Sequence, residues 1–254
     1  MIWAFNTFLA EPIYNLLIGI YAVVPGQDIG IAIILLTIII KLILWPLAAK
    51  SIKGQQALQK LQPKLAEIKE QYKDDKEGQS KAMMKLYADE KVSPLSSCLP
   101  LLVQLPIILA LYRVFLHGLN DDATYRLYSF IPDPETISPL FFGVVDLSNP
   151  NIFLAIGAGI FQFFQAKMMN LRKPPKEVAG SKGAKDEAML SSMNRSMVYF
   201  MPIITVVIGA SLPGGLTLYW MVVNIISVIQ QYIFFRKIKQ EEANTTDTKE
   251  PSVS

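Results

Sequence analysis

A lysine inside a long apolar run constrains this chain more than any other feature. The run extends from Ile29 to Ala49 and contains one charged residue, Lys41. About 20 apolar residues are typical of a membrane span, and a charge at the centre of a span costs about 2.5–3.5 kcal/mol on insertion scales. Lys41 lies about 13 Å from Lys50 at 1.5 Å rise per residue, which is far for a side chain that must reach the interface. We therefore expect a functional cation in a hydrated cavity; the alternative is a lysine that snorkels to the membrane surface.

Composition supports a membrane protein with several spans. Hydrophobic residues make up 52% of the 254 positions, which is high for a soluble domain. The apolar stretches predict five spans, at residues 29–49, 95–117, 151–170, 197–212 and 216–235. None of these contains Asp or Glu, so Lys41 has no carboxylate partner within its predicted surroundings.

The distribution of charge predicts the orientation of the spans. Ten lysines face seven acids between Lys50 and Lys91, and seven basic residues face three acids between Lys167 and Arg195. The segment 118–150 instead has one basic residue, Arg126, against five acids. Because basic residues favour the cytoplasmic side, we expect a multi-pass protein of the bacterial plasma membrane with its N-terminus outside and its C-terminus inside.

The segments between the spans predict the rest of the organisation. Residues 1–28 lack the positive region of a signal peptide and have helical apolar spacing, so we expect an interfacial helix on the outer face. A sixth span is the alternative, but it would break the charge pattern. The remaining segments are predicted as a cytoplasmic helical hairpin (50–94), which turns at Asp74–Gly78 and is kinked at Pro63, an outer loop (118–150), a flexible cytoplasmic loop (171–196), an outer turn (213–215) and a cytoplasmic tail (236–254), disordered from Glu241.

Polar residues keep helical register inside the predicted spans. The last span has a continuous polar face, formed by Thr217, Trp220, Asn224, Ser227 and Gln231. The first span has a shorter polar face with Thr37 and Lys41, and the third has one with Gln162 and Gln165. Gln104 lies between two prolines in the second span. Amides within a membrane usually face the protein interior. We expect a shared hydrophilic groove; the alternative is that the amides join helices by hydrogen bonds.

Motifs for catalysis or cofactor binding do not occur in the sequence. It has no phosphate-binding loop, dinucleotide fingerprint or metal-ligand cluster, and it has one cysteine, Cys98, and one histidine, His117. We expect no enzyme activity, no metal and no small-molecule cofactor. The mixed charges and few aromatics of the hairpin predict no sequence-specific binding of nucleic acid, although ribosome contact by charge remains open.

From Ile29 to Arg236 the chain resembles the YidC-type membrane protein insertases, the YidC/Oxa/Alb family. The resemblance is carried by the central cation with Trp45-Pro46-Leu47, and by several further motifs: Leu61-Gln62-Pro63, Pro94 through Tyr112, Phe164 through Met169, Met201-Pro202, Pro213 through Trp220, and Asn224 with Gln230-Gln231. The large outer domain of many Gram-negative members has no counterpart in these residues.

The resemblance implies an all-α integral membrane protein whose five transmembrane helices surround a hydrophilic groove open to the cytoplasm and to lipid. It implies a groove lined by Lys41, Gln104, Gln165 and Trp220, with Lys41 where relatives usually have arginine. The implied function is insertion of nascent membrane proteins into the lipid bilayer, alone or with the Sec translocon, and we expect the ribosome as a further partner. Two other functions remain open from the sequence: a small-solute or ion channel, and a purely structural assembly factor.

Overall fold

The protein is mostly helical, as expected. The computed structural model describes residues 2–93, 99–118, 126–134, 136–169 and 198–247. In chain order the elements are α1 (Ile2–Phe5), the π-helical turn η1 (Asn6–Ala10), α2 (Glu11–Val23), α3 (Ile29–Ile43), α4 (Trp45–Gln71), α5 (Lys76–Asp89), α6 (Leu99–Arg113), the π-helical turn η3 (Val114–Gly118), β1 (Leu140–Phe141), β2 (Val145–Asp146), α7 (Ile152–Met169), an unlabelled helix at Val198–Gly209, and α9 (Gly214–Asp247). The predicted loop at 171–196 lies outside the described residues.

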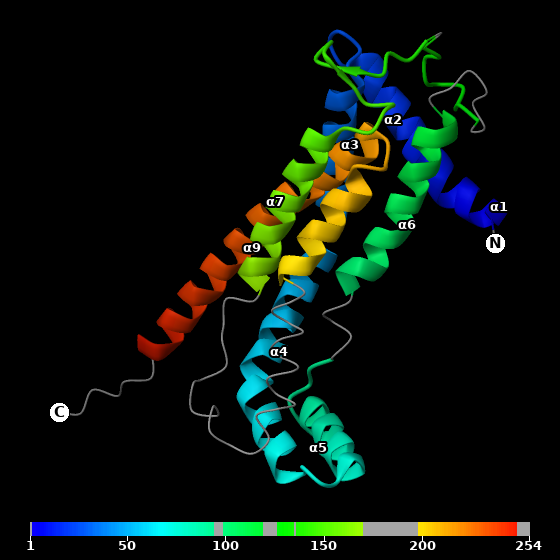
Figure 1. The fold of residues 1–254 in the computed structure, drawn as a ribbon. Coiled ribbons are helices and arrows are strands. Elements are labelled where there is room, and N and C mark those ends of the chain that lie inside the picture. The colour runs from blue at the N-terminus through cyan, green and yellow to red at the C-terminus, as the bar shows by residue number, and fades with distance from the viewer. Residues whose placement is uncertain (1, 94–98, 119–125, 135, 170–197, 248–254) are drawn as a thin grey trace.

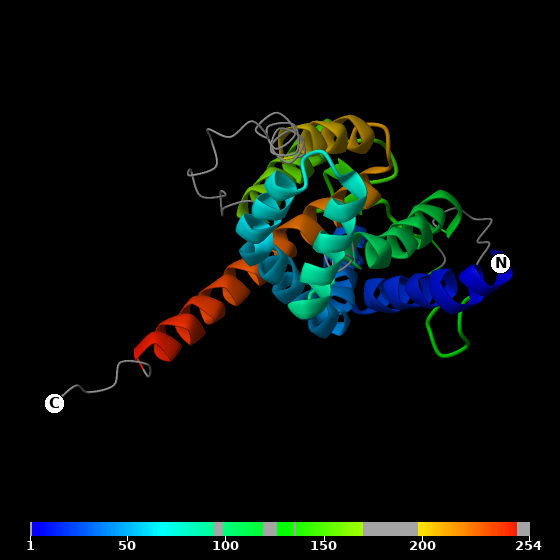
Figure 2. The same cartoon turned by 90° about the horizontal axis from the view of Figure 1, so that it is seen from below.

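The predicted cytoplasmic and outer segments lie at opposite ends of the helix bundle. Figure 1 shows α4 and α5 extending from one end, and the green segment between α6 and α7 covering the other. This segment contains the antiparallel β1–β2 pair, in which Leu140 is opposite Asp146. Figure 2 shows α1 and α2 running beside α6, away from α7 and α9. The bundle therefore has two distinct ends, one helical and one formed mainly by loop.

Helix lengths identify fewer full membrane spans than the five predicted. Gly214–Lys237 is long and apolar enough to cross a membrane, and α3 with α4 provides a second candidate that is bent by 63°. Three shorter apolar helices occupy the remaining predicted spans, at Leu102–Leu116, Ile152–Met168 and Val198–Gly209. By length and composition alone, the helices in the described part of the chain thus provide one clear span, or two if the bent pair counts as one.

The shorter helices nevertheless have exposed apolar rows. On α7 the row contains Phe153, Ile156, Ile160 and Phe164, and on α6 it contains Leu102, Leu105 and Leu109. These residues recur every three or four positions, so each row follows one side of its helix. Large exposed apolar surfaces are rare on soluble monomers. The rows are the surface expected of helices that contact lipid.

Helix α9 is the element that the other helices pack against. It lies along α7, and Asn224 Nδ2 donates to the Ala158 backbone oxygen of α7 at 3.1 Å. The buried Ala155 and Ala158 allow the two helix backbones to come close, as small residues do in membrane proteins. At the start of α9, Thr217 Oγ1 donates to the Gly209 oxygen at 3.0 Å, which connects α9 to the preceding helix.

Side chains near α2 and α3 hold the loop that covers the other end. Asn15 Oδ1 accepts from Tyr128 N at 2.7 Å, and Tyr21 Oη accepts from Ser138 N at 3.0 Å. Asn15 is buried and also donates to the Arg126 oxygen. These bonds satisfy backbone groups of a segment that has little regular structure of its own.

The helices of the first predicted span and of the hairpin differ in part from the sequence prediction. The helix break occurs at Leu44, between α3 and α4, whereas α4 continues through Pro63. Pro46 explains the position of the break, because proline is favoured in the first turn of a helix and disfavours a helical conformation in the residue before it. The predicted turn at Asp74–Gly78 overlaps the observed one in part: α4 ends at Gln71, α5 begins at Lys76, and Asp75 caps α5 by accepting from the Gly78 N–H at 2.8 Å.

The predicted disordered tail was wrong in part. Helix α9 extends to Asp247, so the segment from Glu241 to Asp247 is helical; residues 248–254 lie outside the described part of the chain. The segment has no proline or glycine between Arg236 and Asp247, and a polar composition alone does not end a helix that has already formed.

We predict that Asn224→Ala destabilises the bundle by about 0.6 to 1.7 kcal/mol, the range for hydrogen bonds between membrane helices. The reason is the loss of the bond to Ala158 between α9 and α7. Thermal unfolding in detergent measures the effect. Ser211→Ala is the matched control, because Ser211 is exposed in the turn after the helix Val198–Gly209 and, among the described contacts, its hydroxyl bonds only to Val207 in the last turn of that helix. Equal unfolding temperatures for Asn224→Ala and the control would contradict the prediction.

Candidate functional site

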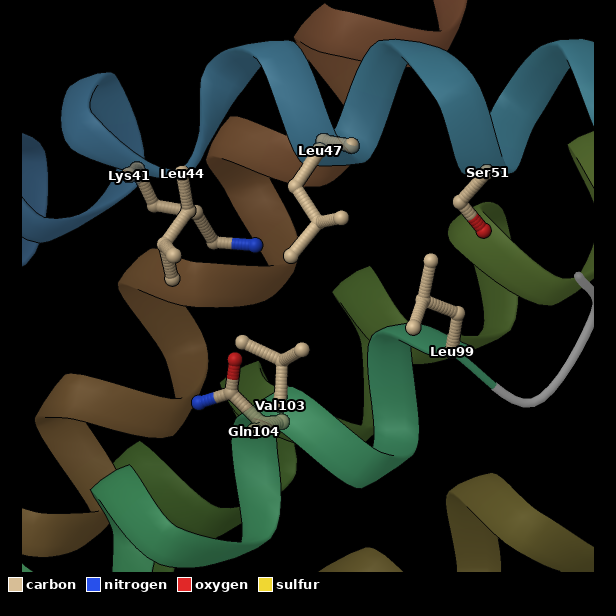
Figure 3. A pocket seen from close by; sticks show the side chains of 8 residues that line it. Lys41, Leu44, Leu47, Ser51, Leu99, Val103 and Gln104 are labelled. Carbon is tan, nitrogen blue, oxygen red and sulfur yellow. The ribbon is translucent and has the colours of Figure 1, made fainter.

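Lys41 and Gln104, two of the predicted groove residues, line one cavity. The cavity has a volume of about 60 Å³ and lies between the α3–α4 bend and α6. Figure 3 shows Lys41, Leu44 and Leu47 directed toward Val103 and Gln104 of the facing helix. A cavity needs about 10–15 Å³ of such space to hold a water molecule, so this one is large enough to hold water. The polar groups therefore meet in a space large enough to be hydrated.

The bend between α3 and α4 gives this cavity its shape. Lys41 is in the last turn of α3, and Leu47, Ala48 and Ser51 are in the first turns of α4. Because the two helices differ in direction by 63°, residues on both sides of the bend line the same space. The break at Leu44 thus places a cation beside aliphatic walls, and the cavity is amphipathic.

The Lys41 ammonium is held by a neutral partner. Lys41 Nζ donates to Ser227 Oγ of α9 at 2.9 Å, and Ser227 Oγ donates to the Val223 oxygen at 2.7 Å. Within the described part of the chain, the ion pairs do not include Lys41. An ammonium has three donors, so this bond leaves two for water or for an anionic ligand. The charge is positioned and not neutralised.

Gln104 is also held by α9. Its Nε2 donates to the Tyr219 hydroxyl, and Tyr219 is buried. The amide oxygen of Gln104 makes no described hydrogen bond to the chain. Lys41 and Gln104 therefore supply donors and an acceptor to one cavity, and each is positioned by a hydroxyl group of α9.

The other predicted groove residues lie outside the lining of this cavity. Thr37 is buried and donates to the Ile33 oxygen of its own helix at 2.6 Å. Gln162 Oε1 accepts from Thr205 Oγ1 at 2.6 Å, which joins α7 to the helix at Val198–Gly209. Asn224 joins α9 to α7. Gln162 and Asn224 thus make the interhelical hydrogen bonds that the sequence left as the alternative.

Gln165 and Trp220 are half-buried and do not line the cavity. Two groups missed by the sequence argument are the hydroxyl of Tyr219 and the cavity-lining Ser51. Helical spacing from Lys41 could have identified Ser51, because Leu44, Ala48 and Ser51 follow it in steps of three and four. Nothing in the local sequence distinguishes Tyr219 from a core tyrosine.

Comparisons with known proteins agree with the resemblance. The family model described as the 60Kd inner membrane protein matches residues 20–242. A membrane protein insertase YidC of Magnetococcus marinus is 37% identical over 235 residues, which are 92% of this chain and 36% of that protein. The YidC of Francisella philomiragia is 35% identical over 232 residues, with 91% and 36% covered. The chain spans about a third of the length of these relatives.

A solved structure provides independent support for the fold. The crystal structure of an active YidC insertase with its first transmembrane domain resolved matches with a TM-score of 0.54 and 26% sequence identity. The match covers 82% of this chain and 42% of the solved one. Since the family model extends over most of the sequence and the relatives agree with it, this chain belongs to the 60Kd inner membrane protein family, whose members named above are YidC membrane protein insertases.

Proposed function

We propose that this chain inserts newly made membrane proteins into the lipid bilayer and uses the cavity at Lys41 as the receiving site. The observation that carries the proposal is an ammonium without an ion pair in the described part of the chain, held by Ser227 in a cavity between helices with exposed apolar rows. The names of the relatives support the same function. We propose no catalytic step for the site.

The proposed membrane arrangement has five helices crossing the bilayer, with the α1–α2 helix in the outer interface. The positive-inside rule favours α4 and α5 on the cytoplasmic side and the loop that contains β1 and β2 outside. Their positions at opposite ends of the bundle agree with this assignment. Helices shorter than about 20 residues can serve as spans where the protein thins the surrounding bilayer.

The proposed mechanism begins with a substrate's polar flank entering the cavity. The flank would otherwise cross about 30 Å of hydrocarbon, and a hydrated site part of the way across shortens the dry path. The Lys41 ammonium attracts an acidic flank, and the walls formed by Leu44, Leu47 and Val103 tolerate the adjoining apolar segment. Burial of about 20 apolar residues in lipid then drives insertion without a nucleotide.

In this proposal Lys41 acts as a positive charge and does not bind a carboxylate in the bidentate way of an arginine guanidinium. Its ammonium has two donors left after the bond to Ser227, whereas an arginine could bind a carboxylate with two parallel bonds. The hairpin α4–α5 is the proposed contact for the ribosome, and we include the Sec translocon as a further partner. The support for both is the basic charge of the cytoplasmic segments and the family membership.

We predict that Lys41→Arg preserves most insertion activity, whereas Lys41→Ala lowers insertion of acidic-tailed substrates about tenfold. A tenfold change corresponds to about 1.4 kcal/mol, which is less than the roughly 4 kcal/mol attraction of a close charge pair at an effective dielectric of 20. Lys41→Glu should be the most defective variant, because it repels the acidic tail. Reconstituted liposomes with single-span substrates that have acidic or neutral tails provide the measurement.

Lys50→Ala is the control for loss of a positive charge, because Lys50 is exposed on α4 and does not line the cavity. If Lys41→Ala inserts both substrates as well as the unchanged protein, the cavity charge has no role in insertion. Solute leak through the same liposomes without insertion would favour a channel. If the liposomes show neither insertion nor solute leak, the result would favour a structural assembly factor.

We also predict that Ser227→Asp impairs acidic-tailed substrates nearly as much as Lys41→Ala. The aspartate would be close enough to form an ion pair with Lys41 Nζ, which lies 2.9 Å from Ser227 Oγ, and so it would neutralise the charge while Lys41 is retained. Ser227→Asn has a similar size without the charge and is the matched control. Normal insertion by Ser227→Asp in the liposome assay would show that the field of Lys41 is not what the substrate uses.

A further inference from the structure

The turn between β1 and β2 contains a residue that the turn disfavours. Phe142 has φ of 50° and Gly143 has φ of 69°, and Val144 N donates to the Phe141 oxygen at 3.1 Å. Positive φ at both central residues is the pattern of a type I′ turn, in which Asn, Asp and Gly are preferred at the first position. A bulky residue with positive φ is an outlier. Such outliers persist where the residue serves a purpose beyond the local backbone.

Burial within the chain does not explain Phe142. Its side chain is 69% exposed and that of the neighbouring Val144 is 82% exposed. Phe141 is the residue that enters the fold, and the Phe142 ring lies against it with centroids 4.5 Å apart. The turn therefore projects an apolar tip, Phe142–Val144, away from the described core.

The hairpin formed by β1, β2 and their turn is hydrogen-bonded to the start of α3. Asp28 Oδ1 accepts from Ile31 N at 2.9 Å and caps the helix, while Asp28 Oδ2 accepts from Phe142 N. The Phe141 ring lies directly over Gly30, where a Cβ would come within 2.0 Å of it. One carboxylate and one glycine thus join the hairpin to α3, so a force on the tip acts on that helix.

We propose that the tip Phe142–Val144 inserts into the phospholipid interface at the outer surface and fixes the depth of α3. The proposal rests on the membrane arrangement given above. Its support is the position of the hairpin at the outer end of α3 and its closeness in sequence to the exposed row of α7, which starts at Phe153 with 81% of its side chain exposed. Aromatic and aliphatic side chains that an aqueous loop would leave in water are favoured at a lipid interface.

Depth matters because α3 contains Lys41. Lys41 is thirteen positions after Asp28 (41 − 28), and thirteen steps along a helix span about 20 Å. With the tip in the outer interface, Lys41 lies about two thirds of the way through a hydrocarbon layer of about 30 Å. The hairpin then acts as a stop that prevents α3 from moving toward the cytoplasm and carrying its charge out of the membrane.

Spin labels on the full chain in phosphatidylcholine vesicles test this inference. Cys98, the one cysteine in the sequence, is replaced by serine, and single cysteines are introduced by Val144→Cys, Phe153→Cys and Thr136→Cys. Collision rates with oxygen, which concentrates in lipid, and with a water-soluble nickel complex report the environment. The label at 144 should favour oxygen, as the label at 153 does, whereas the label at the exposed Thr136 should favour nickel.

Two variants separate lipid contact from folding. Phe142→Asn suits the turn, so it should leave the unfolding temperature in detergent unchanged or raised, yet shift the label at 144 toward nickel. Phe142→Trp should keep the label in lipid. Three results would overturn the proposal. The label at 144 in the unchanged turn could favour nickel, or it could be protected from both reagents, as in a protein contact. The third is a lower unfolding temperature for Phe142→Asn. A nickel-favouring label at 153 would instead contradict the membrane arrangement itself.

Discussion

The position of the Lys41 ammonium inside an apolar helix bundle is the constraint on which the site depends. A charge in a low-dielectric region is stable only if it keeps water or polar partners. Here the direct partner is the neutral hydroxyl of Ser227. A neutral acceptor satisfies one donor without cancelling the charge, so the cavity must supply the remaining solvation. Two features of the structure allow the charge to keep these partners. Helix α9 lies beside α3 and supplies Ser227, and the helix break at Leu44 opens the cavity beside Lys41.

Helix α9 is hydrogen-bonded to four other helices, and three of these bonds are to the helices around the cavity and α7. Ser227 accepts from Lys41 of α3, the Tyr219 hydroxyl accepts from Gln104 of α6, and Asn224 donates to Ala158 of α7. Such bonds are individually modest in membrane proteins, but together they fix where the three helices lie around one axis. The polar face of α9 is therefore divided between shaping the cavity and joining helices, and it does not form one continuous wet surface.

The sequence predicted the helical class, because apolar run length is a local signal, and an isolated charge is a local signal too, which is why Lys41 could be selected as a site candidate before its cavity was known. It grouped Lys41 and Gln104 in one groove from their polar character inside apolar runs, and the resemblance implied the same grouping. It failed where tertiary contacts decide: a single Asn such as Asn224 has the same sequence signal whether it faces water or a neighbouring backbone oxygen. The break at Leu44 was not predicted, because a proline in an apolar run does not by itself show where a helix bends; Pro46 lies beside the bend, whereas α4 continues through Pro63. The lengths of the shorter helices also depend on packing, which hydropathy does not report.

Crosslinking from position 41 to a stalled nascent chain tests the central claim most directly. A photoreactive residue at 41 should capture a single-span substrate whose N-terminal flank is still in transit, and capture should fall once the substrate has been released into lipid. The same residue at position 160, in the exposed apolar row of α7, should capture the apolar segment later or not at all. Capture at 41 of nothing but lipid, at every stage of insertion, would contradict the proposal that the Lys41 cavity receives the substrate.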